Sequence, residues 1–183
     1  MKVEENKTEL PTSSIELVNK LDYWKISYKL YFHEPLMTVK ESKTMQKKIF
    51  GLDKSNGHIK NLFLRDKRKN NILLVAHQDT IIDLKLLAKN LNLDRLSFGS
   101  PERLMENLGV LPGAVSPFSM INGVKKDVKL FLDNNLKSFK KIFAHPLENN
   151  QTIEIPIEQL EIFFKKISAT PIWISLQIKN KNY

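Results

Sequence analysis

Two short apolar runs separated by a polar turn place the strongest constraint on how this chain can fold. Apolar side chains alternate imperfectly over residues 59–64, a polar run follows at 65–71, and residues 72–76 are apolar throughout. Runs of this length with turn residues between them are typical of a β-hairpin. The pattern puts Lys60 at the start of the first strand, where a rigid element can aim its amine into a cleft.

Helices are predicted around this hairpin from capping residues and helical periodicity. Ser13 to Glu16 and Thr38 to Glu41 are capping boxes, and the second predicts a helix to Ile49 that Gly51 closes. Further helices are expected at 83–91, 100–109 and 156–167. Strands are expected at 26–32, 118–121, 128–132, 140–144 and 152–155, and a loop at 53–57.

These elements predict a single α+β domain with a mixed, mostly antiparallel sheet and flanking helices, because strands and helices intermix without βαβ regularity. We expect residues 1–12 to be a flexible N-terminal segment, 13–168 the domain, and 169–183 a C-terminal tail. Residues 171–176 are apolar enough to pack back as an edge strand. The alternative for this stretch is a self-association surface.

The charge balance favours a polyanionic partner. The 183-residue chain has 29 Lys and Arg against 20 Asp and Glu, a net charge of +9. Such an excess can neutralise phosphates and release counterions, although a solvated basic face would also explain it. The sequence has no apolar run long enough to span a membrane and no signal-peptide core, so we expect a cytoplasmic protein.

Several kinds of chemistry are disfavoured by what the sequence lacks. There is no cysteine, and the four histidines are far apart in sequence, so no metal site is expected. Glycine-rich nucleotide-binding motifs and the Gly-x-Ser-x-Gly elbow of serine hydrolases are also missing, and we expect no cofactor.

Three segments remain as candidates for a site. They are Lys60-Asn61, the loop at 113–117 and the segment 145–150. The loop consists of Gly113, Ala114, Val115, Ser116 and Pro117, and its backbone amides could approach a carbonyl or phosphate oxygen. An ordinary turn would explain the same residues. His145 follows a strand and precedes a proline, a position from which a histidine can orient a substrate or move a proton, or simply be structural.

Together these segments resemble the YbaK-like prolyl-tRNA editing family, and in particular its freestanding alanyl-tRNA(Pro) deacylases. The matching pieces are "HEP" at 33–35, "KNLFLRD" at 60–66, "DLKLLAKNL" at 83–91, "RLSFGSPERL" at 95–104, "LGVLPGAVSPFSMIN" at 108–122, "LFLDNNL" at 130–136 and "HPLENN" at 145–150.

The resemblance implies hydrolysis of the ester that joins a wrong amino acid, chiefly alanine, to tRNA(Pro). It implies that Lys60 places positive charge near the terminal nucleotide, while Asn61 and His145 orient the substrate. The amides of the 113–117 loop would hold the carbonyl or terminal adenosine, with Asn149 beside them. Attack by water would be assisted by the terminal ribose hydroxyl. Arg65 and Arg95 match positions that read the acceptor stem.

The sequence departs from the family pattern at two places beside this pocket. Ile59 stands where relatives often have threonine, and Asn150-Gln151 stands where Thr-Ala is expected. Cysteine, serine or threonine could therefore replace alanine as the amino acid removed. A non-catalytic tRNA-binding adaptor of the same fold and an unrelated basic RNA binder would also fit the charge of the chain, and prolyl-tRNA synthetase is a further candidate partner.

Overall fold

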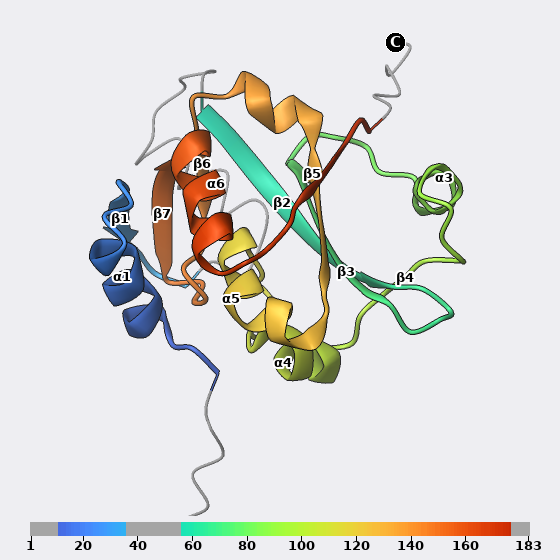
Figure 1. Ribbon diagram of the computed structural model, residues 1–183, viewed down its shortest axis with the longest axis horizontal. Coiled ribbons are helices and arrows are strands. Elements are labelled where there is room, and N and C mark those ends of the chain that lie inside the picture. The colour runs from blue at the N-terminus through green and yellow to red at the C-terminus, as the bar shows by residue number, and fades with distance from the viewer. Residues whose placement is uncertain (1–10, 36–55, 177–183) are drawn as a thin grey trace, which may run out of the picture.

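The computed structural model describes residues 11–35 and 56–176. Its centre is a sheet in the order β1-β7-β6-β2-β3-β5-β8, with β4 paired to β2 off this path (Figure 1). The strands are β1 (Lys29–Phe32), β2 (Asn56–Arg65), β3 (Asn71–His77), β4 (Ser97–Phe98), β5 (Lys129–Asp133), β6 (Lys141–Ala144), β7 (Gln151–Pro156) and β8 (Ile172–Ile174). The mixed sheet of the predicted single α+β domain is confirmed.

Antiparallel pairs form most of the sheet. They join β1 to β7, β2 to β3, β2 to β4 and β6 to β7, and parallel pairs join β2 to β6, β3 to β5 and β5 to β8. A parallel pair needs a long crossover connection. The 84–126 segment supplies one such connection between β3 and β5, and it contains the helices that cover the sheet near its middle.

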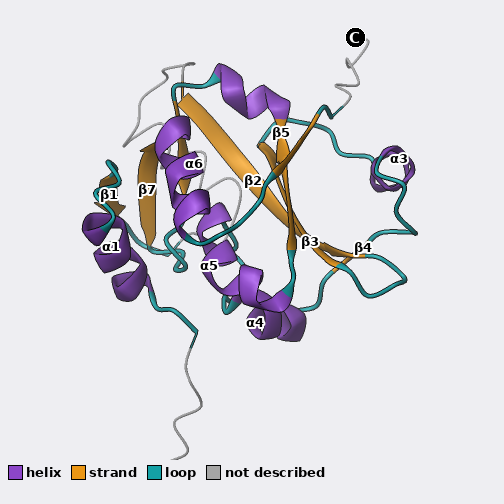
Figure 2. Cartoon of the chain, in the orientation of Figure 1, coloured by secondary structure: helices purple, strands orange, loops and turns teal. Residues whose placement is uncertain are grey.

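Helices cover both faces of the sheet (Figures 1 and 2). They are α1 (Ser14–Tyr23), α3 (Leu84–Asn90), α4 (Pro101–Leu108), α5 (Met120–Gly123) and α6 (Ile157–Lys166), with short 3-10 turns η1 (Pro117–Ser119), η2 (Val124–Lys126) and η3 (Asn134–Ser138). The larger apolar core takes residues from α1, α4, α5 and α6, and the smaller one takes residues from α3. No helix of the described residues is long and apolar enough to cross a membrane.

Some predicted elements differ from the structure. The strand expected at 118–121 is wrong, because η1 and α5 occupy those residues. Ser116 accepts a hydrogen bond from the amide of Phe118, and Pro117 stands at the first helical position, which together start a helix. The first strand begins at Lys29 instead of residue 26. The helix expected at 38–49 and most of the 1–12 segment lie outside the described residues.

Candidate active site

Lys60 lies in the middle of β2, so the prediction that it starts a strand is wrong. Asn56 and Gly57, which were expected in a loop, already belong to β2. The strand is longer than its apolar pattern suggested because both residues pair with β6. Leu62 and Leu64 contact the smaller core, and by alternation Lys60 lies on that same face.

Strands β2 and β6 separate next to Lys60. One edge of β2 pairs with β6 at 56–58 and with β4 at 64–65, and within the described residues no strand pairs with that edge between them. His58 and Phe143 form the last pair with β6, and their rings stack with centroids 4.9 Å apart. Lys60 lies two residues further along β2, and His145 lies two residues after Phe143, just past the end of β6. They therefore lie on the same face, where the strands diverge.

The ammonium group of Lys60 is held by the neighbouring turn. Its Nζ donates to the backbone carbonyl oxygen of Thr80. The amide of Thr80 donates to the carbonyl of His77 at 3.0 Å, and its buried hydroxyl donates to a carboxylate oxygen of Asp133 at 3.4 Å. Asp133 is fully buried and also accepts from the backbone and side-chain amides of Asn135. A buried carboxylate thus fixes the turn that positions the amine.

Partial burial also changes the acid–base properties of this cluster. Burial lowers the pKa of Lys60, and the exposed carboxylate of Asp79 opposes that effect. Burial, together with the nearby His77, lowers the pKa of His58. His77 stacks on Phe139 with ring centroids 5.0 Å apart. The stacked rings of His58 and Phe143 therefore line the face beside the amine, whereas His77, which pairs with Ile59, lies with Phe139 on the other face.

His145 presents one ring nitrogen to the site. Its Nδ1 lies 2.7 Å from the carbonyl oxygen of Gln151, and this geometry assigns the proton to Nδ1. Nε2 is then an acceptor, and burial lowers the pKa of the ring further than the bond to Gln151 raises it. The ring centroid of His33 lies 6.0 Å away, and His33 Nε2 is 2.8 Å from the hydroxyl of Thr152. A neutral His145 can accept a proton or a hydrogen bond.

The 113–117 loop lies against the segment that follows His145. A methyl group added to Gly113 would come 3.6 Å from the Nδ2 of Asn149, and Gly113 adopts a φ of +89°. The side chain of Ser116 is fully buried and caps η1, so it is structural. Within the described residues, the amides of Val115 and Ser116 donate no hydrogen bond to the protein. Val115 is partly exposed, so its amide is free to bind an oxygen of a substrate, whereas the amide of Ser116 is buried.

Asn61 lies on the opposite face of β2 from Lys60. Its neighbours Ile59 and Phe63 contact the larger core, which also contains Ala114 and borders Val115. The Oδ1 of Asn61 is buried and has no hydrogen-bond partner among the described residues. A buried orphan acceptor of this kind calls for an explanation, and an external donor would supply one. The structure therefore brings Lys60 and His145 to one face but leaves Asn61 on the other.

Arg65 and Arg95 lie at the far end of the hairpin. Arg65 pairs with Ser97 of β4, and Arg95 is an exposed residue just before that strand. Lys60 and Arg65 are separated along β2 by about 16 Å at the usual rise of a strand. Arg68 in the turn pairs with Asp94 at 2.8 Å. These arginines form a separate basic end of the molecule and do not meet the amine of Lys60.

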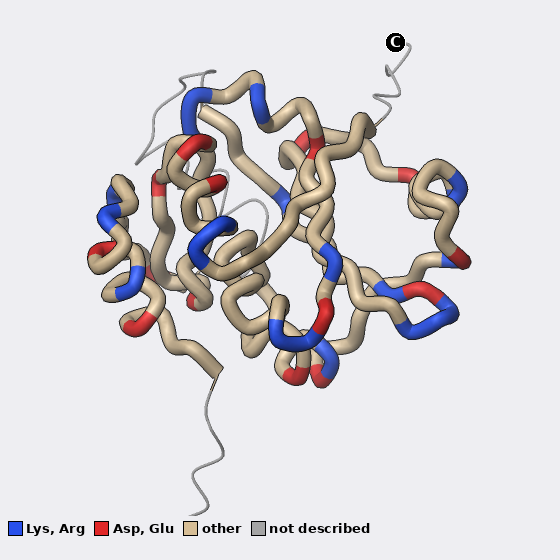
Figure 3. Tube along the Cα trace, viewed as in Figure 1, with Lys and Arg blue, Asp and Glu red and all other residues tan. Residues whose placement is uncertain are grey.

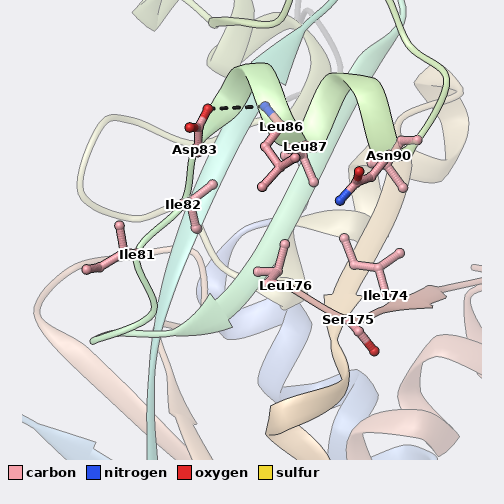
Figure 4. A pocket seen from close by; sticks show the side chains of 10 residues that line it. Ile81, Ile82, Asp83, Leu86, Leu87, Asn90, Ile174, Ser175 and Leu176 are labelled. Atoms are coloured by element: carbon pink, nitrogen blue, oxygen red, sulfur yellow. Dashed lines mark hydrogen bonds between the residues drawn. The ribbon is translucent and has the colours of Figure 1, made fainter. Parts of the chain in front are cut away.

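A cavity of about 240 Å³ lies beyond Thr80, between the 81–91 segment and 174–176 (Figure 4). Most of its lining is aliphatic, including Ile82, Leu87 and Ile174. The carboxylate of Asp83 caps α3 by accepting from the amides of residues 85 and 86. The cavity offers no group suited to ester hydrolysis, so the candidate active site is the parting of β2 and β6.

Sequence reasoning missed three residues of this site: Thr80, Asp133 and the imidazole of His33. Asp133 is a buried acidic residue at a strand end, but only the fold shows that its partner is Thr80, 53 residues earlier. His33 belongs to the "HEP" segment, whose local sequence gives no sign of a role for the ring. Its position after β1, next to β7, brings it to His145.

Most of this chain matches a known protein family. The family model described as "Aminoacyl-tRNA editing domain" matches residues 33–163. The chain belongs to the aminoacyl-tRNA editing domain family. The predicted resemblance and the predicted enzyme class, an aminoacyl-tRNA deacylase, are confirmed.

Curated relatives and a solved structure agree with this assignment. "Prolyl-tRNA editing protein ProX" of Acetoanaerobium sticklandii is 36% identical over 150 residues, covering 81% of this chain and 88% of the relative. "Prolyl-tRNA synthetase associated domain-containing protein 1" of Mus musculus is 31% identical over 162 residues, covering 86% and 92%. A crystal structure described as a candidate trans-editing enzyme for prolyl tRNA synthetase shares the fold, with a TM-score of 0.65 and 16% identity over 88% of this chain and 96% of that one.

Proposed function

We propose that this chain is a trans-editing deacylase that hydrolyses the ester of mischarged tRNA(Pro), with alanine as the amino acid removed. Membership in the editing family and the similarity to a prolyl-tRNA editing protein support the reaction. The observation that carries the proposal is the half-buried amine of Lys60, held by the Thr80 carbonyl where β2 and β6 part. Alanine is smaller than proline, so a synthetase pocket for proline cannot exclude it strongly, and a second site must correct the error.

The residues of the site have distinct roles in the proposed reaction. The ammonium of Lys60 stabilises negative charge that develops near the terminal nucleotide as water attacks the ester carbonyl. The partly exposed amide of Val115 holds the carbonyl or the terminal adenosine, with Gly113 and Asn149 beside it. The loop residues Ala114 and Pro117 are buried and fix its shape.

Proton movement in the proposed reaction uses the substrate and His145. The ester carbonyl carbon gains an oxygen from water and loses the ribose oxygen, which leaves with a proton, so alanine and free tRNA are the products. The terminal ribose hydroxyl helps to organise the attacking water, and Nε2 of His145 accepts a hydrogen bond from one of these groups. Asn61 orients the substrate from the other side of β2, where its Oδ1 is buried without a protein partner among the described residues.

Recognition of the tRNA is proposed for the basic end of the hairpin. Arg65 and Arg95 are separated from Lys60 by a length of strand that suits an acceptor end reaching from one to the other. Guanidinium groups can make paired contacts to phosphates or base edges, so they read the acceptor stem. Prolyl-tRNA synthetase is the proposed protein partner, because the mischarged tRNA that this chain would hydrolyse is released by that enzyme.

Hydrolysis of matched esters tests the proposal. Purified chain is mixed with tRNA(Pro) carrying alanine, serine, cysteine, threonine or proline, and the remaining ester is followed with time. Rapid loss of alanine with proline spared is the expected result. Faster loss of cysteine, serine or threonine would mean that this amino acid, and not alanine, is the preferred one, while the deacylation reaction stays as proposed. Salt-sensitive tRNA binding without hydrolysis of any ester would contradict the proposal and favour an adaptor of the same fold.

A further inference from the structure

An exposed aromatic side chain stands on the short strand β4. Phe98 is 63% exposed, whereas Leu64, its partner on β2, is fully buried. An aromatic ring that stays exposed to water contributes little to the stability of the fold. Exposed aromatic rings often occur at sites that bind other molecules. Phe98 is therefore a candidate contact for a partner.

The register of the sheet places this ring on the same face as Lys60. Directly opposite residues of an antiparallel pair point to the same face, and side chains of β2 alternate, so Phe98, Leu64, Leu62 and Lys60 share one face. Leu64 and Lys60 are separated along β2 by about 13 Å at the usual rise of a strand. Phe98 is one strand to the side of that line.

The position of Phe98 is fixed by its neighbour Gly99. The amide of Gly99 donates to the carbonyl oxygen of Phe63 at 2.9 Å. A Cβ added at Gly99 would lie 2.3 Å from a ring carbon of Phe63, so only glycine lets the chain approach β2 this closely. The backbone next to Phe98 is thus fixed against β2, and this fixes the position of the ring.

Positive charge surrounds this end of the sheet. Arg95 is exposed just before β4, whereas Arg65, paired with Ser97, points to the other face of the sheet. The turn from β2 to β3 adds Lys67 and Lys69, both exposed. Figure 3 shows basic positions, in blue, along this turn. An aromatic ring among cations is the combination with which proteins bind single-stranded nucleic acid, because every base can stack and every phosphate attracts charge.

We propose that Phe98 stacks on an unpaired base of the tRNA acceptor end while the terminal ester lies at Lys60. This inference rests on the proposed function and adds a contact to it. Stacked nucleotides rise by about 3.4 Å each, so about 13 Å corresponds to roughly four nucleotides. The base that meets Phe98 is therefore close to where the unpaired end joins the acceptor helix, and the exposed cations Arg95, Lys67 and Lys69 bind the phosphates beside it.

Two substrates of different length test this contact. Alanyl-tRNA(Pro) spans the distance from Lys60 to Phe98, whereas alanyl-adenosine covers only the terminal ester. Phe98→Ala is expected to raise KM for the tRNA by roughly 5- to 150-fold, the range for losing one stacked base, with kcat unchanged. Its rate on alanyl-adenosine should equal that of the wild type. Phe98→Trp should restore the KM, because a larger ring also stacks.

A matched control separates stacking from a general loss of exposed aromatic surface. Tyr23 is 83% exposed and lies at the end of α1, so Tyr23→Ala should leave KM unchanged. Urea unfolding of each variant checks that the fold is kept. Equal KM for Phe98→Ala and wild type would overturn the proposal, as would an equal loss on alanyl-adenosine.

Binding of uncharged tRNA(Pro), followed by fluorescence anisotropy, distinguishes failure of this inference from failure of the proposed function. If the wild type hydrolyses no ester, the proposed function fails, yet weaker binding by Phe98→Ala still supports the contact. If Lys60→Ala is inactive while Phe98→Ala binds and reacts as the wild type does, the function stands and the contact is wrong. In that case the ring serves something other than RNA.

Discussion

Replacing Thr80 by valine tests whether the buried carboxylate positions the amine of Lys60. The change keeps the side-chain shape and removes the hydroxyl that donates to Asp133 at 3.4 Å. A hydrogen bond to a charged group contributes about 1.5–3 kcal/mol, and a bond this long should be near or below the lower end. Asp133 keeps its two bonds from Asn135. We therefore expect the free energy of unfolding to fall by about 1–2 kcal/mol.

The kinetic effect should exceed what this loss of stability explains. A folded enzyme with a stability change of this size keeps almost all of its molecules native, so stability alone leaves kcat unaltered. Misplacement of the Thr80 carbonyl moves the ammonium of Lys60, and small errors in position can cost up to about 100-fold in rate. We expect kcat on alanyl-tRNA(Pro) to fall roughly 10- to 100-fold with little change in KM.

Urea unfolding and single-turnover deacylation measure the two effects on the same preparations. Thr80→Ser keeps the hydroxyl and should recover most of kcat. A double-mutant cycle with Asp133→Asn gives the coupling between the two side chains, which contact each other and should not be additive. The reasoning is refuted if Thr80→Val unfolds more easily but reacts at the wild-type rate, or if serine fails to restore the rate that valine loses.

Three further predictions concern packing, pH and salt. Gly99→Ala should lower the free energy of unfolding by about 1–3 kcal/mol in urea titrations, because the new methyl overlaps the ring of Phe63, and no change would contradict that contact. Burial lowers the pKa of His145 below that of an unfolded histidine, so the unfolded chain binds a proton first and stability should fall as the pH drops below about 6.5. His145→Gln should flatten this decline in urea titrations at several pH values, and an unaltered slope would show that other groups cause it. Arg65→Ala should reduce the slope of log affinity against log salt for tRNA by about one, whereas an unchanged slope would argue against a phosphate contact.

Elements with explicit start and stop signals could be predicted from the sequence. The Ser13 capping box is present in full, and Ser100 caps α4, whose end at Gly109 has a φ of +66°. These signals are local, because each involves residues within one or two turns of helix. The hairpin could also be predicted, since its turn residues and apolar runs are contiguous in the sequence.

Contacts between distant segments could not be predicted in the same way. Residues 118–121 have a strand-like composition, but the cap at Ser116 and the position of Pro117 make them helical. The start of β2 depends on pairing with β6, about 85 residues later. Lys60 and Asn61 are adjacent in sequence, which suggests that both side chains belong to one site. Side chains alternate along β2, however, so the two residues point to opposite faces of the sheet.

Deacylation of alanyl-tRNA(Pro) by wild type and Lys60→Ala at excess enzyme tests the central claim most directly. Loss of a positioned group that stabilises developing charge typically costs about 100- to 1,000-fold, so the wild type should clear the ester and Lys60→Ala should be slower by that factor. Lys85→Ala, which removes an exposed lysine on α3, should react as the wild type does. Equal rates for Lys60→Ala and wild type would contradict the account.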